Sequence, residues 1–309
     1  MNFIASLIYR PPRCQYKKIT YDSSIQYEDG SFGKRITVQF ENKRNQTICG
    51  SFYISPSPAP GNPCLIYLHG NASSQNEGAW IPFMLCPHGV NVLCIDTSGS
   101  GNSDGEYISL GYYERDDVKA AMDFLREKYN VKAFSLWGRS MGASIAAWCA
   151  ADNFDLSSVV IDSAYESVRE IIKDLHGNSW LLWLLSKMVL PFVNRRVKKA
   201  IGISIDDIDV TPNLGKAVVP ALFVHASYDS FIKVREARSM FAKYGGKTKF
   251  MMTTKGDHNS NRPHEVIYTI TCFILSNFDI DDEEIEIEQT QSDNSSAHYN
   301  NAFDMMKDM

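Results

Sequence analysis

The chain has 309 residues, 44% of them hydrophobic and 22% charged, and its formal net charge is −5. This composition supplies enough apolar material for one large core, and it excludes a mainly disordered chain and a general nucleic-acid-binding protein. The acidity is local, because residues 279–309 carry ten acidic side chains and one lysine, a net −9, which leaves +4 for the rest of the chain.

The start of the chain and its cysteines bear on the cellular compartment. Residues 1–10 have no basic region and too short an apolar run for a secretory signal peptide. The seven cysteines form no CxxC pair and lie mostly in apolar runs, as expected of free thiols in a reducing compartment, so we expect a cytoplasmic protein. The longest apolar segment, 180–193, is shorter than the ~20 residues of a spanning helix, and no transmembrane segment is expected.

The first predicted elements are two strands, 34–40 and 47–54, which the polar turn 41–45 joins into a hairpin. After a Pro-rich connector, short apolar runs alternate with longer helical stretches. This alternation predicts a mostly parallel, eight-stranded sheet with helices on both faces. The six apolar runs are 64–68, 90–95, 134–137, 159–161, 221–224 and 250–252, and the predicted helices are 113–129, 140–151, 234–244 and 266–278.

A motif with a candidate nucleophile directly follows the run Phe-Ser-Leu-Trp at residues 134–137. Gly138-Arg139-Ser140-Met141-Gly142 fits the GxSxG pattern, and the small apolar residues after it predict a helix, which completes a strand–turn–helix context. The turn is so sharp that side chains at Gly138 and Gly142 would collide with backbone. Ser140 then stands at a helix N-terminus, whose dipole favours a developing negative charge. A chance Gly-Ser turn is the alternative, and the flanking elements favour the catalytic interpretation.

Two backbone N–H groups are candidates for an oxyanion hole. One belongs to Met141, directly after the nucleophile. The other belongs to Asn71, which follows the first parallel strand and its His69-Gly70 turn, with the neighbouring Ala72 as the alternative. We interpret His69 as a structural residue that braces the turn, rather than as a catalyst.

The loop between the last strand and the last helix supplies the candidate base, His258. A base must approach the nucleophile from the carboxyl edge of the sheet, where this loop lies. Among the other histidines, His264 stands at a predicted helix start and is expected on the surface. His88 and His176 lie in earlier loops, and His298 lies in the acidic tail.

The acid is expected between Ser140 and His258 in the chain, and Asp229 is the preferred candidate. It follows the next-to-last strand, in a loop from which it can accept a hydrogen bond from the imidazole and fix its tautomer. Asp162 is the alternative, and its other role would be to cap the following segment. Asp257 is adjacent to the base and cannot easily reach the far nitrogen of the ring.

A glycine-containing loop, 96–101, closes another strand with the sequence Asp-Thr-Ser-Gly-Ser-Gly. A GxG pattern after a strand can indicate a dinucleotide site. The third glycine of that motif does not fall at the required spacing, where Asp104 stands instead. We therefore expect a structural loop that supports the site.

Several of these motifs together resemble a group of plant and protist α/β-hydrolases that is filed with the serine aminopeptidase-like branch. The similarity is carried by Ile-Tyr-Leu-His69-Gly70-Asn71, Asp96-Thr-Ser-Gly99-Ser-Gly101, Leu-Trp-Gly138-Arg-Ser140-Met-Gly142-Ala, Val-Pro-Ala-Leu-Phe-Val-His225-Ala, Gly256-Asp257-His258-Asn259-Ser-Asn-Arg-Pro263 and, near the start, Arg10-Pro-Pro-Arg13. It covers about residues 3–278 and implies the α/β-hydrolase fold with a catalytic triad. A more distant similarity connects the chain to the depalmitoylating α/β-hydrolase-domain proteins, which carry a cysteine-rich acylated N-terminus where this chain has only Cys14.

The segment at about 163–218 departs from simple alternation and is expected to be a short helical cap inserted in a domain of residues 1–278. The acidic residues 279–309 are expected to form a disordered tail. Trp180, Trp183 and Leu184 begin an apolar stretch of the insertion that precedes a basic cluster. One interpretation is a cap that lines the substrate pocket and prefers acyl chains, and a second is ordinary core packing. A third is peripheral membrane contact, because apolar and basic residues lie side by side.

These features predict a serine hydrolase that acts on carboxylic esters or thioesters through an acyl-Ser140 intermediate, with His258 as base and then as acid. A serine exopeptidase of the aminopeptidase-like kind is the alternative enzyme. A scaffold on an inactive hydrolase fold is the alternative outside enzymes. The expected partner is a small-molecule, acyl or peptidyl substrate; no nucleic acid, no metal and no organic cofactor is implied, and the sequence indicates no oligomeric state.

Overall fold

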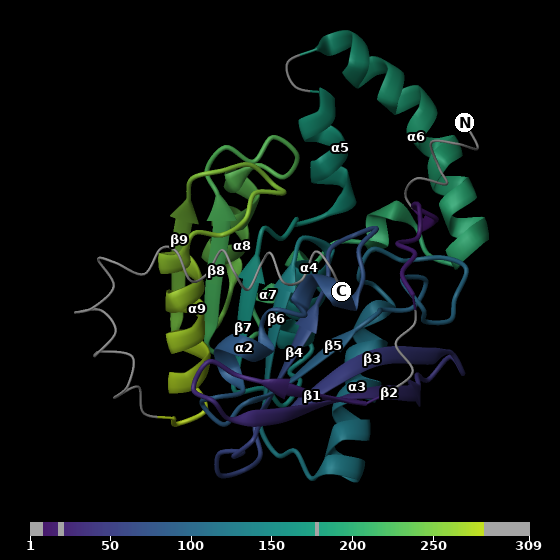
Figure 1. Cartoon of the computed structure of the whole chain (residues 1–309). Coiled ribbons are helices and arrows are strands. Elements are labelled where there is room, and N and C mark those ends of the chain that lie inside the picture. Colours follow the sequence, from purple (N-terminus) through teal and green to yellow (C-terminus); the bar gives the residue numbers. More distant parts are fainter. Residues whose placement is uncertain (1–8, 18–21, 177–178, 281–309) are drawn as a thin grey trace.

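The computed structural model of the chain describes residues 9–17, 22–176 and 179–280 (Figure 1). Most of the expected acidic tail, residues 281–309, thus lies outside the described residues. Within them, one sheet of nine strands is sandwiched between helices. The strands are β1 (Ser23–Gln26), β2 (Phe32–Glu41), β3 (Thr47–Ile54), β4 (Cys64–Leu68), β5 (Asn91–Ile95), β6 (Phe134–Arg139), β7 (Ser158–Asp162), β8 (Ala221–Ala226) and β9 (Lys249–Thr254).

The strand order is β1-β2-β3-β5-β4-β6-β7-β8-β9. The first three strands form an antiparallel meander that joins β5, and every pair from β5 to β9 is parallel. The predicted mostly parallel sheet is therefore confirmed. The carboxyl ends of the parallel strands meet at one edge, which is where the functional loops of open α/β sheets lie.

The sheet has one strand more than the eight that we predicted. The additional strand, β1, has the sequence Ser-Ser-Ile-Gln and no apolar run, and its residues alternate between partial burial and exposure. It exists because its backbone pairs with residues 32–35 of β2 at the edge of the sheet. Such pairing between backbone groups leaves little trace in the side-chain pattern.

Helices cover both faces of the sheet (Figure 1). In the larger cluster of buried hydrophobic residues, α3, α4, α7 and α8 pack on one face of the sheet. In the smaller cluster, α2 and α9 pack on the other face. The four predicted helices correspond to α3, α4, α8 and α9, with ends that agree within two residues. The helices are η1 (Gln75–Gly78), α2 (Pro82–Leu85), α3 (Glu114–Tyr129), α4 (Met141–Ala151), α5 (Val168–His176), α6 (Trp180–Ile201), η2 (Ile205–Asp207), α7 (Thr211–Leu214), α8 (Val234–Lys243) and α9 (His264–Ser276).

The insertion between β7 and β8 contains α5 and α6. Figure 1 shows α6 as a long curved helix beyond the carboxyl edge of the sheet, and Pro191, which lacks an N–H group, lies inside it. The second half of α6 packs as core through the buried Val193 and Val197. In the first half, the side chains of Trp180, Leu181, Leu184, Leu185 and Met188 are exposed. In the described part of the chain, no helix is long and apolar enough to cross a bilayer.

Candidate active site

Ser140 stands at the turn between β6 and α4. Its φ of 53° is positive, which is rare and costly for a residue other than glycine. The glycines around it allow the turn, because a Cβ at Gly138 would lie 2.0 Å from the carbonyl oxygen of Gly142, and a Cβ at Gly142 would lie 1.9 Å from that of Leu68. The N–H of Ser140 donates to the carbonyl oxygen of Asp162 at 2.8 Å, which ties the turn to the end of β7.

Three side chains that are far apart in the chain meet at this turn. Nε2 of His258 lies 2.9 Å from Oγ of Ser140, and Nδ1 of the same ring lies 2.6 Å from Oδ2 of Asp229. A carboxylate only accepts hydrogen bonds, so Nδ1 carries the ring proton and Nε2 is left to accept the hydroxyl proton of Ser140. In this arrangement an imidazole can act as a general base on a hydroxyl.

The carboxylate of Asp229 is buried and held from several sides. Its Oδ1 accepts the backbone N–H groups of Phe231 and Ile232 at 3.0 and 2.7 Å. Nε2 of His225 lies 3.5 Å from Oδ2, and burial lowers the pKa of His225, which keeps that ring neutral. The rings of Phe231 and His258 meet edge-on, with centroids 5.3 Å apart. These contacts hold the carboxylate and the imidazole in one relative orientation.

The turn after β4 lies against the nucleophile and is held by a carboxylate. Gly70 is so close that a Cβ there would lie 3.7 Å from Cβ of Ser140. The N–H of Gly70 donates to the side chain of Glu77 at 3.2 Å, and the hydroxyl of Tyr67 donates to the same carboxylate at 2.8 Å. The N–H of Gly70 is therefore occupied, and the next N–H groups of the turn are the ones left for a ligand.

The two predicted oxyanion donors lie on the two turns that flank the nucleophile. Asn71 follows Gly70 and lines the same cavity as the nucleophile, and Met141 opens α4, where a backbone N–H has no partner inside the helix. His69 is fully buried: its Nδ1 donates to the carbonyl oxygen of Gly70 at 2.7 Å, and its Nε2 accepts the N–H of Thr97 at 3.2 Å. Both ring nitrogens are engaged by backbone, which suits a structural residue.

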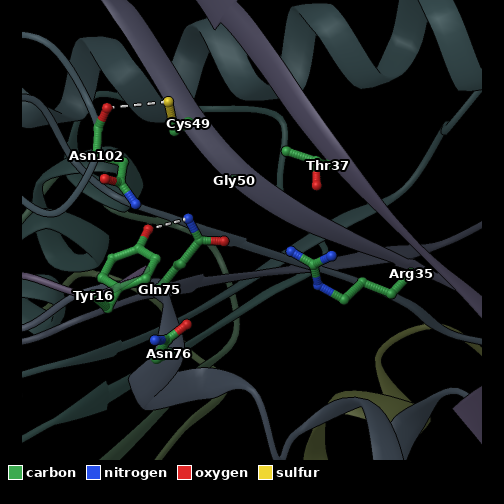
Figure 2. Close-up of a pocket in the computed structure, with 8 residues that line it drawn as sticks. All are labelled: Tyr16, Arg35, Thr37, Cys49, Gly50, Gln75, Asn76 and Asn102. Carbon is green, nitrogen blue, oxygen red and sulfur yellow. Dashed lines mark hydrogen bonds between the residues drawn. The ribbon is translucent and has the colours of Figure 1, made fainter. Parts of the chain in front are cut away.

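The loop after β5 supports this turn through Asp96. Its carboxylate accepts the N–H groups of Gln75 and Asn102 at 2.8 Å each, and also the hydroxyl of Tyr16. Figure 2 shows Tyr16, Gln75 and Asn102 around a small pocket of about 10 Å³, which is room for about one water molecule. The cavity is too small for a substrate, so it belongs to the scaffold that attaches residues 10–17 to the loop.

Two arginines connect the loop of His258 to neighbouring strand ends. Arg139 donates to the carbonyl oxygen of His258 at 3.1 Å. Arg262 pairs with Asp162 through two nitrogens, at 3.0 and 2.6 Å, and both side chains are almost fully buried. Bidentate pairs of this kind have a strict geometry. Asp162, the alternative acid, is thus committed to Arg262, and the imidazole is contacted by Asp229 instead.

The remaining candidates have other surroundings. Asp257 accepts the backbone N–H groups of Ser230 and His258 at 2.6 and 2.7 Å, and these hydrogen bonds, with that from Ser230 the strongest, lower the pKa of its carboxyl group. Its carboxylate therefore shapes the loop rather than contacting the far side of the ring. His264 begins α9 and is exposed, as expected.

An open cavity of about 810 Å³ lies over the nucleophile and is lined by both Ser140 and His258. Its charged lining residues are Glu77, Arg139 and Asp257. This volume is in the range of pockets that bind small molecules. Among the described residues, no group of three His, Cys, Asp or Glu side chains is placed to hold a metal ion.

Two of the predicted pocket residues of the cap, Trp180 and Leu184, do not line this cavity. Trp180 and Leu184 are 73% and 42% exposed, and neither is among the described residues that line the cavity. The side chain of Trp183 lies outside what the structure describes. The expectation that Trp180 and Leu184 line the substrate pocket is not met, because residues of other segments line the cavity. α6 extends beyond the edge of the sheet (Figure 1).

Sequence reasoning did not find four residues that hold the site together: Glu77, His225, Arg139 and Arg262. Arg139 lies within the GxSxG pattern and His225 ends a strand run, but neither position indicates a partner. Arg262 and Asp162 are separated by 100 residues. No local signal pairs residues at such distances.

The chain is similar in sequence and in fold to known proteins. Residues 63–203 match the model of a family described as alpha/beta hydrolase fold. Among curated relatives, the uncharacterized protein YqkD of Bacillus subtilis is 24% identical, with 67% of this chain and 68% of that protein covered. The uncharacterized protein YfhR of Salmonella typhimurium is also 24% identical, with 82% and 85% covered.

Solved structures agree with the family match. The esterase Pf2001 of Pyrococcus furiosus superposes with a TM-score of 0.65 at 20% identity, covering 86% of this chain and 98% of that one. Acetyl xylan esterase 1 of Thermoanaerobacterium superposes with a TM-score of 0.60 at 16% identity, covering 84% and 89%. Together with the sheet order, these similarities confirm the prediction that the chain has the α/β-hydrolase fold.

Proposed function

We propose that the chain is a serine hydrolase that cleaves carboxylic esters or thioesters through an acyl intermediate on Ser140. The observation that supports this most directly is the continuous hydrogen-bonded series from Ser140 through His258 to Asp229 at the mouth of a cavity of about 810 Å³. Hydrolysis is also consistent with the similarity to solved esterases, which by itself concerns only the fold.

In the acylation step, Nε2 of His258 takes the hydroxyl proton while Oγ of Ser140 attacks the carbonyl carbon. The negative charge of Asp229 stabilises the imidazolium that forms. The N–H groups of Asn71 and Met141 stabilise the oxyanion of the tetrahedral intermediate, a contribution of several kcal/mol in comparable sites. The intermediate then collapses, and the proton on Nε2 passes to the leaving alcohol or thiol.

Deacylation repeats these steps with water. His258 accepts a proton from a water molecule as the water oxygen attacks the acyl carbon. The N–H groups of Asn71 and Met141 again stabilise the oxyanion that forms. When the intermediate breaks down, the carbon–Oγ bond is cleaved, the acid product leaves, and the proton on Nε2 returns to Oγ of Ser140. No further reactant is consumed.

A serine exopeptidase is the second candidate, because two carboxylates, Glu77 and Asp257, line the cavity and could bind the free amine of a peptide. Both carboxylates already accept hydrogen bonds from the protein, and Arg139 stands in the same lining. Among the described residues that line the cavity, both carboxylates are thus already engaged by the protein. We accordingly prefer esters and thioesters as substrates. We further propose that residues 1–278 form one catalytic domain, with α5 and α6 in its insertion.

A fluorophosphonate probe tests the mechanism, with Ser140→Ala as the variant and Ser144→Ala as the matched control. Ser144 lies one helical turn further on, buried, with its hydroxyl on the backbone of Tyr165. We expect labelling of the wild type and of Ser144→Ala, and none of Ser140→Ala. Equal labelling of the Ser140→Ala protein would assign the nucleophile to another residue and end the proposal.

The substrate class needs a separate measurement. We expect p-nitrophenyl acyl esters to be hydrolysed with a higher kcat/KM than aminoacyl arylamides. Faster cleavage of the arylamides would favour the exopeptidase. If a folded protein reacts with neither the probe nor any of these substrates, the scaffold interpretation replaces both enzymes.

A further inference from the structure

The outer face of α6 divides into an apolar part and a basic part. Trp180, Leu184, Met188 and Phe192 are spaced four residues apart, so they form one row along the helix, and all four are exposed. Leu181 and Leu185 lie beside this row and are also exposed. An exposed apolar row of this length is unusual on a monomer, and it indicates a surface that another apolar phase covers.

The same row becomes basic in the last turns of the helix. Arg195, Arg196, Lys198 and Lys199 are exposed, and Arg196 continues the four-residue spacing from Phe192. No acidic residue occurs within residues 180–201. The net charge of this surface is therefore strongly positive, although the chain as a whole is negative. The outer face is complementary to a surface that is apolar within and anionic at its boundary.

The opposite face of α6 attaches the helix to the protein. Val193 and Val197 are buried in the main core cluster, and Val189 and Leu190 pack partly against it. The side chain of Asn194 accepts the backbone N–H of Ile205 at 2.8 Å. The helix therefore presents its outer face from a fixed base, which reduces the entropy lost when that face binds.

We propose that the outer face of α6 docks the protein on an anionic phospholipid membrane. The apolar row inserts at the boundary of headgroups and acyl chains, and the basic turns bind lipid phosphates and carboxylates. α6 lies in the interface plane and does not span it. This membrane role is independent of the hydrolase activity. Of the interpretations that the sequence left open for this segment, membrane contact thus replaces pocket lining for the outer face of α6.

Vesicle flotation of the full chain at low salt tests the proposal. We expect binding to phosphatidylcholine vesicles that contain about 30% phosphatidylserine, and at least about tenfold weaker binding to phosphatidylcholine alone. The double variant Arg195→Glu/Arg196→Glu should lower the partition coefficient on the anionic vesicles about tenfold or more, as should Trp180→Ser/Phe192→Ser. Raising the salt to about 0.5 M should weaken wild-type binding strongly.

Matched controls separate docking from unspecific effects. Phe250 on β9 is 56% exposed, close to the 59% of Phe192, and Phe250→Ser should bind vesicles like the wild type. Lys247→Glu, an exposed charge reversal far from α6 in the chain, should do the same. Thermal unfolding of each variant verifies that it is folded.

Three results would overturn the proposal. The first is wild-type binding that is absent, or equal on neutral and anionic vesicles. The second is a loss of binding in the controls as large as in the α6 variants. The third is a chain that does not float and whose α6 surface is covered by protein. A dimer that Phe192→Ser dissociates would show that a second copy covers it. Carbodiimide cross-links from Lys198 and Lys199 to the acids of residues 281–308 would show that the chain's own acidic segment covers it.

Discussion

Asp229→Asn is the sharpest test of the candidate triad, because the structure determines which atom of the new amide faces the imidazole. Oδ1 of Asp229 accepts two backbone N–H groups, those of Phe231 and Ile232. The amide oxygen of Asn must take that place, since an NH2 group there would face two donors. The NH2 group then points at Nδ1 of His258, where Oδ2 now lies at 2.6 Å.

The consequence for His258 is a change of tautomer. Its Nδ1 must accept from the amide, so the ring proton moves to Nε2, which then cannot accept the proton of Ser140. In serine enzymes with the same arrangement this exchange lowers kcat about 10⁴-fold, which corresponds to about 5.5 kcal/mol of activation free energy. The substitution is nearly isosteric, and we expect the free energy of unfolding to fall by no more than about 2 kcal/mol.

The assay is hydrolysis of p-nitrophenyl acetate, with the rate of fluorophosphonate labelling as a second measure and chemical denaturation as the folding check. Asp257→Asn is the matched control, since it removes a carboxylate one residue from His258 that lies outside the hydrogen-bonded series. It should keep kcat within about tenfold of the wild type, as expected for an exposed charge. If Asp229→Asn retained more than about a tenth of wild-type kcat, or if Asp257→Asn lost as much as it does, the reasoning would be refuted.

Three further predictions follow from the packing. Glu77→Ala should lower kcat about tenfold or more with little change in KM, because it removes the charge-assisted hydrogen bond that orients the oxyanion turn; a change confined to KM would contradict this role. Gly142→Ala should lower the free energy of unfolding, measured by urea titration, by about 3 kcal/mol, because its methyl group would lie 1.9 Å from the carbonyl oxygen of Leu68. Gly215→Ala is the control: its methyl group would lie 3.7 Å from the nearest atom, and the free energy of unfolding should change little. Burial raises the pKa of Glu236 from 4.5 to about 8, so between these pH values the folded state keeps a proton that the unfolded state loses. The contribution of the protonated Glu236 to the free energy of unfolding is therefore complete below pH 4.5 and lost as the pH rises through about 8. The unfolding free energy of Glu236→Gln should therefore decline less between pH 5 and pH 8 than that of the wild type, and parallel profiles would contradict the assignment.

Much of the fold could be predicted because its signals are local. The fully buried parallel strands are short apolar runs, and the buried helix α4 consists mostly of small apolar residues. The exposed edge strand β1 was missed, because its pairing is made by backbone atoms and its side chains carry no apolar pattern. The predicted site residues depended on the order of motifs along the chain, and their catalytic roles stay predictions.

The cap shows where local signals fail. The apolar stretch from Trp180 to Val193 is interrupted only by Ser186, Lys187 and Pro191, yet Trp180 is exposed and Val193 is buried. Composition alone could not separate pocket lining, core packing and membrane contact. The answer depends on how far α6 extends beyond the sheet, and contacts of its second half, such as the hydrogen bond between Asn194 and Ile205 of η2, decide that.

By itself, the sequence determined the alternation of strands and helices and the strand–turn–helix around Ser140, and it predicted His258 as the base with Asp229 or Asp162 as its acid. These are consequences of side-chain size, periodicity and the steric demands of a sharp turn, which act over a few neighbouring residues. Only the tertiary structure decided that Asp229 rather than Asp162 contacts the imidazole, that Glu77 holds the oxyanion turn, and that the first half of α6 faces outward. Each of these depends on a distance between segments that the folded chain brings together, and no rule of local sequence contains such a distance.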